Sequence, residues 1–242
     1  MHKIKYKDTF INYNIKRTKP KKSISIKIKY PDTVEVLSPS YVSDKEIQSL
    51  VLSKANWIFN KLQEFQDKKV EEINLSFEDN SNLPFLGEDY ILNIVKSSNI
   101  INCKLEFDKN KFIAYIPTFI SIDKQNKELK KIFVEWLIWY GTIIVNERIN
   151  IYSKKLNVSF KSFKVKEQKS TWGTCSSLGN IYINYKILLA PIDIVDYVVV
   201  HELCHLREMN HSDRFWTLVQ SVIPDYTIKR NWLKENGFKL KV

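Results

Sequence analysis

The chain has 242 residues, and its 44% hydrophobic and 13% aromatic content suffices for a sizeable core, which excludes a largely disordered protein. Its three cysteines are odd in number and far apart, which excludes a disulfide framework and favours a reducing cytoplasm. The formal net charge of +11 favours contact with anions, but the lysines are spread widely, which is typical of a solvated surface more than of a nucleic-acid-binding stripe.

No membrane segment is expected. The N-terminal sequence MHKIKYKDTF lacks the apolar core of a secretory signal. The most apolar segment, residues 132–145, is too short to span a bilayer and contains Glu135. We therefore expect a cytoplasmic protein in which this segment forms a buried helix.

Residues 1–120 are predicted to be a β-rich N-terminal region with one helix. Ile24, Ile26 and Ile28 alternate with polar residues, which predicts a half-buried strand. The helix is expected to begin at Ser43, because Glu46 three residues later completes a capping box. The predicted elements are strands over 22–30, 33–37, 83–97 and 104–117 and the helix over 43–69.

Residues 121–242 are predicted to be mainly helical. Ser212 suits the start of one helix, which ends at Pro224. The predicted elements are helices over 124–155, 191–209, 212–223 and 226–235 and strands over 158–166 and 180–188. The change near residue 120 is interpreted as the boundary between two regions, which form either two domains or one continuous domain.

Three of the four histidines lie in one short stretch, VVVHELCHLREMNHSDRFW, residues 198 to 216. His201 and His205 are four residues apart, so on a helix they differ by about 40° around the axis and can share one metal ion. Glu202 projects about 100° from His201, where it can reach a water on the metal. Bound zinc lowers the pKa of its water to about 7, so Glu202 can accept the proton and pass it to a leaving group.

A third ligand is needed, and His211 is the predicted one. Glu208 is on the same helix face, but about 10 Å along the axis from His201, too far for bonds of about 2 Å. His211 reaches the metal if the helix ends near Asn210, a residue that suits a C-terminal cap. The sequence thus predicts one zinc ion per chain on His201, His205 and His211, with an open fourth position; cobalt or nickel would also fit three imidazoles.

Simpler interpretations of these residues explain the pattern less well. An H-x-x-x-H pair occurs by chance on many helices, but surface histidines do not explain why three of four gather here. Cys175 is not expected to be a nucleophile, since no separate histidine is left to pair with it. Cys204 is expected to be a small buried packing residue that points away from the ligand face.

The same residues resemble the YgjP-like family of predicted zinc metallopeptidases, which is similar to the SprT-type and WLM-type zincins. The resemblance is carried by WGTCSSLGNIYIN (172–184), by PIDIVDYVVVHELCH (191–205) with the following histidine, and by PDYTIKRNWL (224–233). It implies an α+β fold with a zincin-like catalytic core, in which the active-site helix packs on a small sheet. It also implies metal ligands at His201, His205 and His211 and a catalytic base at Glu202.

The chain departs from the family pattern at one position. The family usually has Arg before the Trp-Gly pair, where this chain has Thr171, and Lys166 or Lys169 is the expected substitute. Trp172 is expected to line the pocket or the core, and Gly173 to permit a tight turn.

The predicted function is a zinc-dependent metallopeptidase that acts on a peptide or protein through metal-bound water activated by Glu202. One alternative is a metal-dependent phosphohydrolase acting on nucleotides, with Lys164, Lys166 and Lys169 near the phosphates, although no phosphate-binding glycine motif is present. Another is a DNA-associated protease, as SprT-type relatives suggest, with nucleic acid as a partner.

The sequence does not decide two features of the substrate site: the group that stabilises the oxyanion and the strand that binds the peptide. Tyr182, Tyr185 and Tyr197 are unranked candidates to stabilise an oxyanion. By analogy with zincins, the strand at 180–188 is either an edge that pairs with an extended peptide or an interior core strand.

Overall fold

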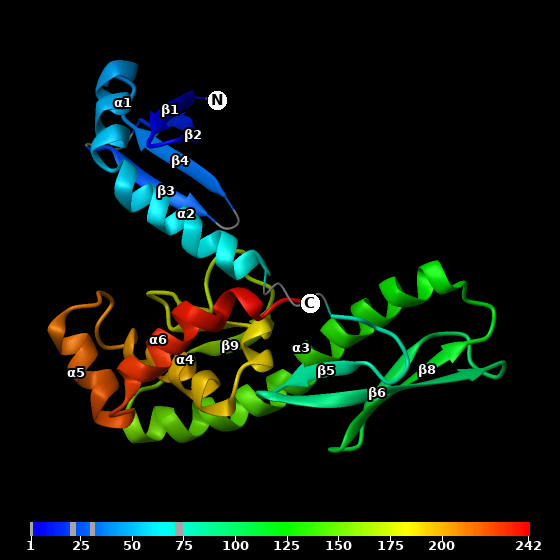
Figure 1. Ribbon diagram of the computed structural model, residues 1–242. Helices are drawn as coiled ribbons and strands as arrows, with labels where there is room; N and C mark the ends of the chain where they lie inside the picture. Colours follow the sequence, from blue (N-terminus) through cyan, green and yellow to red (C-terminus); the bar gives the residue numbers. More distant parts are fainter. Residues whose placement is uncertain (1, 20–22, 30–31, 71–74) are drawn as a thin grey trace. The chain divides into compact units, whose positions relative to one another are not determined.

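The computed structural model describes residues 2–19, 23–29, 32–70 and 75–242, without the side chains of 67–70 and 122–123. The chain divides into two compact units, Met1–Glu72 and Ile73–Val242 (Figure 1). The predicted change near residue 120 coincides with the passage from the last strand of a sheet to a long helix within the second unit. As a domain boundary it stays a prediction.

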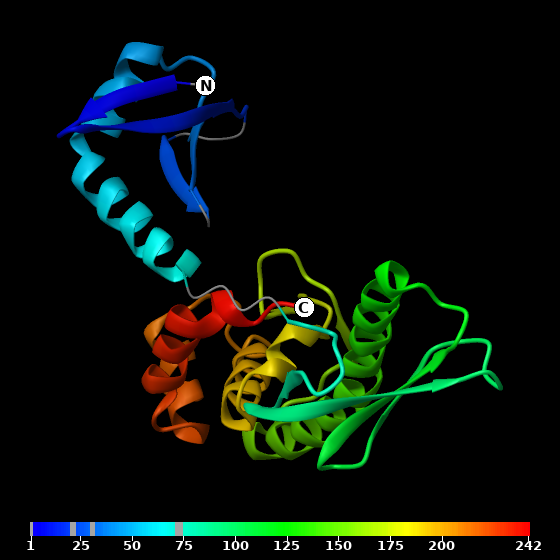
Figure 2. The ribbon, with the colours of Figure 1, turned by 45° about the vertical axis from the view of Figure 1, so that its right-hand side comes forward.

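The first unit is a four-stranded sheet with two helices on one face (Figure 2). The strand order is β1-β2-β4-β3, in which β2 and β4 are parallel and the other pairs antiparallel. Alternating apolar residues such as Ile11 and Val36 form its core with the helices. The elements are β1 His2–Tyr6, β2 Thr9–Arg17, β3 Ser25–Lys29, β4 Thr33–Ser38, α1 Asp44–Ser53 and α2 Ala55–Val70.

The structure has two helices where the sequence predicts one. The capping box is confirmed: the Glu46 amide donates to the Ser43 hydroxyl, and the Glu46 carboxylate accepts from the Ser43 amide. Helix α1 ends at Ser53 with Lys54 as its C-cap, and α2 begins at Ala55. Val51 and Ala55, on either side of this break, are fully buried, so the change of direction keeps both helices on the sheet.

The second unit begins with another four-stranded sheet and a long helix. The strands are β5 Asn82–Phe85, β6 Glu88–Ser97, β7 Lys104–Phe107 and β8 Lys111–Pro117, in the order β5-β6-β8-β7. The turn at Gly87 and the hairpin of β7 and β8 confirm the sequence predictions. Helix α3, Ile122–Leu156, contacts β7 at this sheet and continues past helix α4, Ile192–Cys204 (Figure 1).

A three-stranded sheet lies next to helix α4. It consists of β9 Ser162–Lys166, β10 Gly173–Cys175 and β11 Asn180–Asn184, in the order β10-β11-β9. The strand predicted to 188 ends at Asn184, because the Asn184 side chain accepts from the Lys186 amide and starts the 3-10 helix η1, Tyr185–Leu189. Strand β11 is therefore interior, and β10 is an edge among the described strands.

Three helices complete the unit: α4 Ile192–Cys204, α5 Asp213–Val222 and α6 Tyr226–Asn236, followed by the short 3-10 turn η2, Gly237–Lys239. Helix α4 contacts β10 and β11, which confirms the predicted α+β class with the active-site helix on a small sheet. Helix α4 ends at Cys204, five residues before its predicted end. Ser212 caps α5 as predicted, by accepting from the Phe215 amide.

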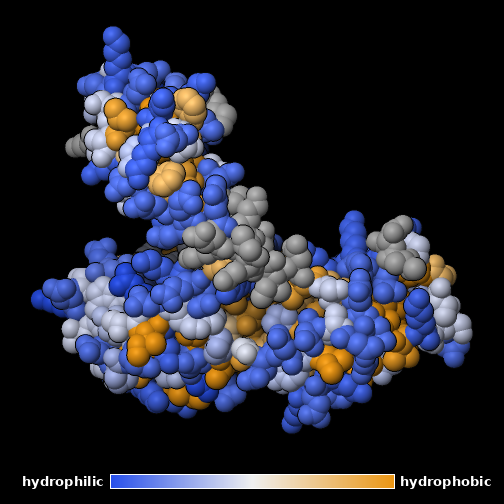
Figure 3. All heavy atoms as spheres, viewed as in Figure 1, coloured by the Kyte–Doolittle hydropathy of each residue, from blue (hydrophilic) through white to orange (hydrophobic). Residues whose placement is uncertain are grey.

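The visible surface is mostly hydrophilic, with apolar side chains in separate groups (Figure 3). Within the described residues, no helix combines the length and the apolar character needed to cross a membrane.

Candidate active site

The core fixes the helix that carries the first two histidines. Val199 and Val200 are fully buried, so the next turn of α4 is held against the small sheet. Asp196 fixes the helix from the other side: Arg148 of α3 donates to both of its carboxylate oxygens, and the Tyr152 hydroxyl donates to one of them over 2.8 Å. The position of His201 therefore follows from packing and from this ion pair.

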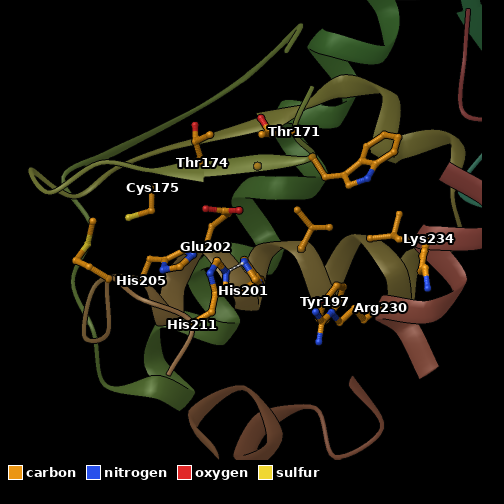
Figure 4. Close-up of a pocket in the computed structure, with 15 residues that line it drawn as sticks. Thr171, Thr174, Cys175, Tyr197, His201, Glu202, His205, His211, Arg230 and Lys234 are labelled. Carbon is orange, nitrogen blue, oxygen red and sulfur yellow. Dashed lines mark hydrogen bonds between the residues drawn. The ribbon is translucent and has the colours of Figure 1, made fainter. Parts of the chain in front are cut away.

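The structure brings the three predicted ligands together. His201, His205 and His211 each offer a ring nitrogen, and these atoms all lie within 4.8 Å of one another (Figure 4). The Nε2 atoms of His201 and His211 are 2.9 Å apart. The third histidine thus turns back toward the helix, as the sequence predicts.

The turn that returns the chain begins earlier than predicted. His205 occupies the C-cap of α4, and the amides of Arg207 and Glu208 bond to the Cys204 carbonyl. The Nδ1 atom of His205 faces the Glu208 carbonyl at 3.1 Å. Because a carbonyl only accepts, Nδ1 carries the proton, and Nε2 is left with its lone pair for a metal.

His211 is held just before α5 by aromatic neighbours. Its ring stacks on Trp216 with centroids 5.6 Å apart, and Phe215 lies 4.7 Å away. Both residues are in the first turn of α5, whose start Ser212 caps. The cap that the sequence shows at Ser212 therefore also positions the third imidazole.

Glu202 lies beneath strand β10 with very little solvent around it. Its side chain is on the β10 side of α4 (Figure 4), and the residue is 4% exposed. Its Oε2 atom is buried without a hydrogen-bond partner. A Cβ at Gly173 would lie 2.6 Å from the Glu202 Cγ and Oε1 atoms, so only glycine fits here. Gly173 is the first residue of strand β10, so the tight turn predicted for it is wrong, and its role is to allow the close approach of Glu202.

Burial changes the protonation of these groups in the metal-free chain. It raises the pKa of Glu202 to about 8. Burial, then the neighbouring charges of His205, His211 and Arg230, lower the pKa of His201 to about 3. The pKa of His205 is also lowered, mainly by burial. The partly buried imidazoles of His201 and His205 are thus neutral, which is the form that binds a metal ion.

These residues fit a metal ion. Three imidazoles are a donor set that zinc accepts at bonds of about 2 Å, and the separations of their nitrogens require only small shifts. The orphaned Oε2 of Glu202 indicates a missing hydrogen-bonding partner, because buried polar atoms are nearly always paired. An ion and a water molecule would supply what the site lacks.

A cavity of about 570 Å³ opens beside the histidines. It lies between β10, α4 and α6, and Trp172 lines it as predicted. The sequence interpretation missed Arg230, Leu233 and Lys234 of α6, although the segment 224–233 that it singled out contains the first two. Nothing local marks these residues, because only the packing of α6 brings them to the cavity.

The tyrosines and cysteines considered from the sequence differ in whether they line the cavity. Tyr197 lines the cavity, whereas Tyr182 and Tyr185 do not. Cys175 also lines it, and burial, then the charge of Glu202, raise its pKa to about 11, so its thiol stays protonated at neutral pH. Cys204 is fully buried away from the cavity, as predicted.

The basic residues upstream of the cavity lie elsewhere. Lys164, Lys166 and Lys169 are absent from its lining, and the Lys166 ammonium lies 3.6 Å from the centre of the Tyr182 ring. Thr171 lines the cavity and donates to the Gln168 side chain over 2.9 Å. Neither lysine therefore substitutes there for the arginine of the family pattern.

Comparisons with known proteins identify one family. Residues 22–236 match the family model described as "YgjP-like, metallopeptidase domain". Two solved structures of metallopeptidase zymogens align with part of the chain. Abylysin of Pyrococcus abyssi is 22% identical with a TM-score of 0.35, covering 37% of this chain and 93% of that one. Jannalysin of Methanocaldococcus jannaschii is 17% identical with a TM-score of 0.32, covering 36% and 92%. No curated protein matches.

Proposed function

Because the chain belongs to the YgjP-like metallopeptidase family, we propose that it hydrolyses peptide bonds with one zinc ion held by His201, His205 and His211. The observation that carries this proposal is the convergence of three imidazole nitrogens within 4.8 Å beside a buried, unpartnered carboxylate. Membership in a peptidase family implies a peptide or protein substrate.

Glu202 is the proposed proton carrier. When bound, the zinc ion supplies a Lewis acid that makes water acidic near neutral pH. The positive charge of the ion would favour the ionised form of Glu202. Ionised Glu202 accepts the proton of the attacking water at its free Oε2 atom and delivers it to the leaving amine. Glu202 is 4% exposed beneath β10, which keeps bulk water away from this carboxylate, and Gly173 leaves the space that the side chain occupies.

Tyr197 is the proposed donor to the developing oxyanion. It lies one helical turn before His201 and lines the cavity. Burial raises the pKa of its phenol to about 12, so the hydroxyl keeps its proton throughout the neutral range. A neutral phenol can donate a hydrogen bond where negative charge develops.

Strand β10 is the proposed partner of an extended substrate. The sequence interpretation considered the strand at 180–188 for this role, but β11 lies between β10 and β9. Strand β10 has one described neighbour and lines the cavity through Gly173, Thr174 and Cys175. An extended peptide can add to such an edge through main-chain hydrogen bonds, without a fixed sequence.

A phosphohydrolase is less well supported. The three lysines considered for phosphate binding lie outside the cavity lining, and the chain has no phosphate-binding glycine loop. A role near DNA stays an alternative that concerns the setting of the protease and leaves the same chemistry in place.

The test is the variant Glu202→Gln. It should retain about one zinc per chain by metal analysis, because Glu202 is not a ligand. Its kcat on a pool of quenched fluorescent peptides should fall by roughly 100-fold or more, as expected for loss of a general acid-base group. His211→Ala should instead lose both zinc and activity.

Nucleoside triphosphates are assayed in parallel with the peptides. Full peptidase activity in Glu202→Gln would exclude the proposed proton transfer. Turnover of a triphosphate without any peptide cleavage would exclude the peptidase function itself.

A further inference from the structure

The end of the cavity formed by α6 differs in character from the end at the histidines. Trp172 and Leu233 give it an apolar wall, and Arg230 and Lys234 add positive charge. In Figure 4, Arg230 lies beside Tyr197, and Lys234 lies farther along α6. Trp172 is fixed there, because its ring packs so closely on Gly237 that a Cβ would lie 2.8 Å from it.

Aromatic stacking fixes the guanidinium of Arg230. Its central carbon lies 4.6 Å from the centre of the Trp216 ring. Trp216 in turn stacks on Tyr226, one turn before Arg230 on α6, with ring centres 5.2 Å apart. A guanidinium held over a ring face keeps the N–H groups at its own edge free, so that they can donate to an oxygen-bearing group.

The positive charge of Arg230 is not neutralised within the described chain. The preceding residue, Lys229, forms ion pairs with Asp193 and Asp225. Arg230 has no described carboxylate within ion-pair distance, and Glu202 is the sole acidic residue among the described residues that line the cavity. Two adjacent basic residues on one helix thus differ: Lys229 is mostly buried and paired, and Arg230 is exposed, lines the cavity and has no described acidic partner.

We propose that the α6 end of the cavity is a subsite that binds a carboxylate of the substrate, with Arg230 as the charged donor. The inference rests on the peptidase function proposed above and adds a substrate class to it. The guanidinium can make two parallel hydrogen bonds to a carboxylate, and the wall of Trp172 and Leu233 contacts the carbon chain that carries it.

Arg230 and the histidines line the same cavity. Tyr197, His201, His205 and His211 line its other end, and the cavity has a volume of about 570 Å³. A carboxylate seated on Arg230 therefore lies in the same cavity as the histidines, where it can belong to the peptide whose bond is cleaved.

Two sources can supply this carboxylate, an acidic side chain or the C-terminus of the peptide. Binding is measured with the full chain carrying Glu202→Gln and loaded with zinc, so that turnover does not interfere. The probes are fluorescein-labelled random hexapeptides in matched pools. One pair differs only in a free or amidated C-terminus, and the other only in Glu and Asp against Gln and Asn.

One or both carboxylate pools should bind about tenfold more tightly than their amide partners by fluorescence anisotropy. Arg230→Ala should abolish this difference, Arg230→Lys should keep part of it, and Arg230→Glu should favour pools rich in lysine. The matched control is Lys229→Gln, which removes the adjacent basic residue and should leave the preference unchanged. Thermal melting verifies that each variant is folded.

Equal affinity of the acid and amide pools, or a preference that survives Arg230→Ala, would overturn the inference. So would Arg230-dependent displacement of the peptides by inorganic phosphate without any acid preference, which would assign the subsite to phosphate. If the wild type cleaves peptides but shows no preference for the acid pools, the subsite proposal is wrong and the peptidase function is retained. If no peptide is bound or cleaved, the proposed peptidase function itself is wrong.

Discussion

The side chain of Glu202 packs directly against Gly173, and this contact restricts which residue can occupy position 173. A Cβ at Gly173 would overlap Glu202 Cγ and Oε1 at 2.6 Å. Gly173→Ala should therefore displace the carboxylate, reducing kcat about 100-fold while zinc binding persists. We expect a loss in the free energy of unfolding of about 1–3 kcal/mol, measured by urea titration.

Ser177→Ala, an exposed substitution in the turn after β10, is the control for this prediction and should change neither quantity. A Gly173→Ala enzyme with wild-type kcat would show that Glu202 does not need its present position.

Glu202 also makes the stability of the metal-free protein depend on pH. Its pKa is about 8 in the folded chain against an ordinary 4.5. Between these values the folded state keeps a proton that the unfolded state releases, so the free energy of unfolding falls as pH rises from 4.5 toward 8. Metal-free Glu202→Gln should lack this fall and exceed metal-free wild type by roughly 2–4 kcal/mol at pH 8.

Urea titrations in EDTA at several pH values measure this difference. His201 acts in the opposite direction: its pKa of about 3 lies below the ordinary 6.5, so its contribution is lost as pH falls through that interval. That loss is common to both proteins and cancels in the comparison. If the free energy of unfolding changed with pH in the same way in wild type and Glu202→Gln, this result would contradict the raised pKa of Glu202.

Short-range spacing made most of the site predictable. The positions of His201, Glu202 and His205 follow from one helical turn, and the Ser212 cap indicates the return of His211. Gly173 and Arg230 could not be assigned their roles from the sequence. Their contacts join β10 with α4 and α6 with α5, and no local pattern encodes which distant segments meet.

At the level of elements, α4 is fixed by its ion pair with α3. Asp196→Ala would leave the Arg148 guanidinium partly buried without its carboxylate. We expect the free energy of unfolding to fall by about 3 kcal/mol in urea titration. Arg148→Met in the same chain should recover part of this loss, because no unpaired charge is then left.

Glu147→Ala, an exposed neighbour of Arg148 on α3, is the control and should have little effect. A loss in Asp196→Ala no larger than in this control would show that the ion pair contributes little to stability.

Element types were more predictable than element ends. Alternating isoleucines identified β3, and the capping box located the start of α1. The break at Lys54 has no Gly or Pro to mark it, since packing on the sheet determines it. Likewise β11 ends at Asn184 because a side-chain cap begins η1, and α4 ends at Cys204 because its last turn tightens onto that carbonyl.

At the scale of the whole molecule, the second unit contains every residue of the proposed site. Its buried residues form one continuous core that is separate from the core of the first unit. Residues 73–242 expressed alone should therefore fold and bind about one zinc per chain, with an affinity within about threefold of the full chain.

Circular dichroism and zinc titration measure these outcomes. An unfolded or zinc-free fragment would show that the first unit is needed to form the site. The sequence indicated a change of secondary structure near residue 120. The separation of the two hydrophobic cores depends on long-range packing, which the spacing of apolar residues along the chain does not reveal.

The wall that α6 gives to the cavity is encoded after all three histidines. On the ribosome, His201 to His211 emerge first, and Trp172 then has no Gly237 to pack against. A nascent chain at that stage would expose the metal ligands with the substrate cavity still open on one side. The order of translation thus delays a finished cleft until α6 has left the exit tunnel.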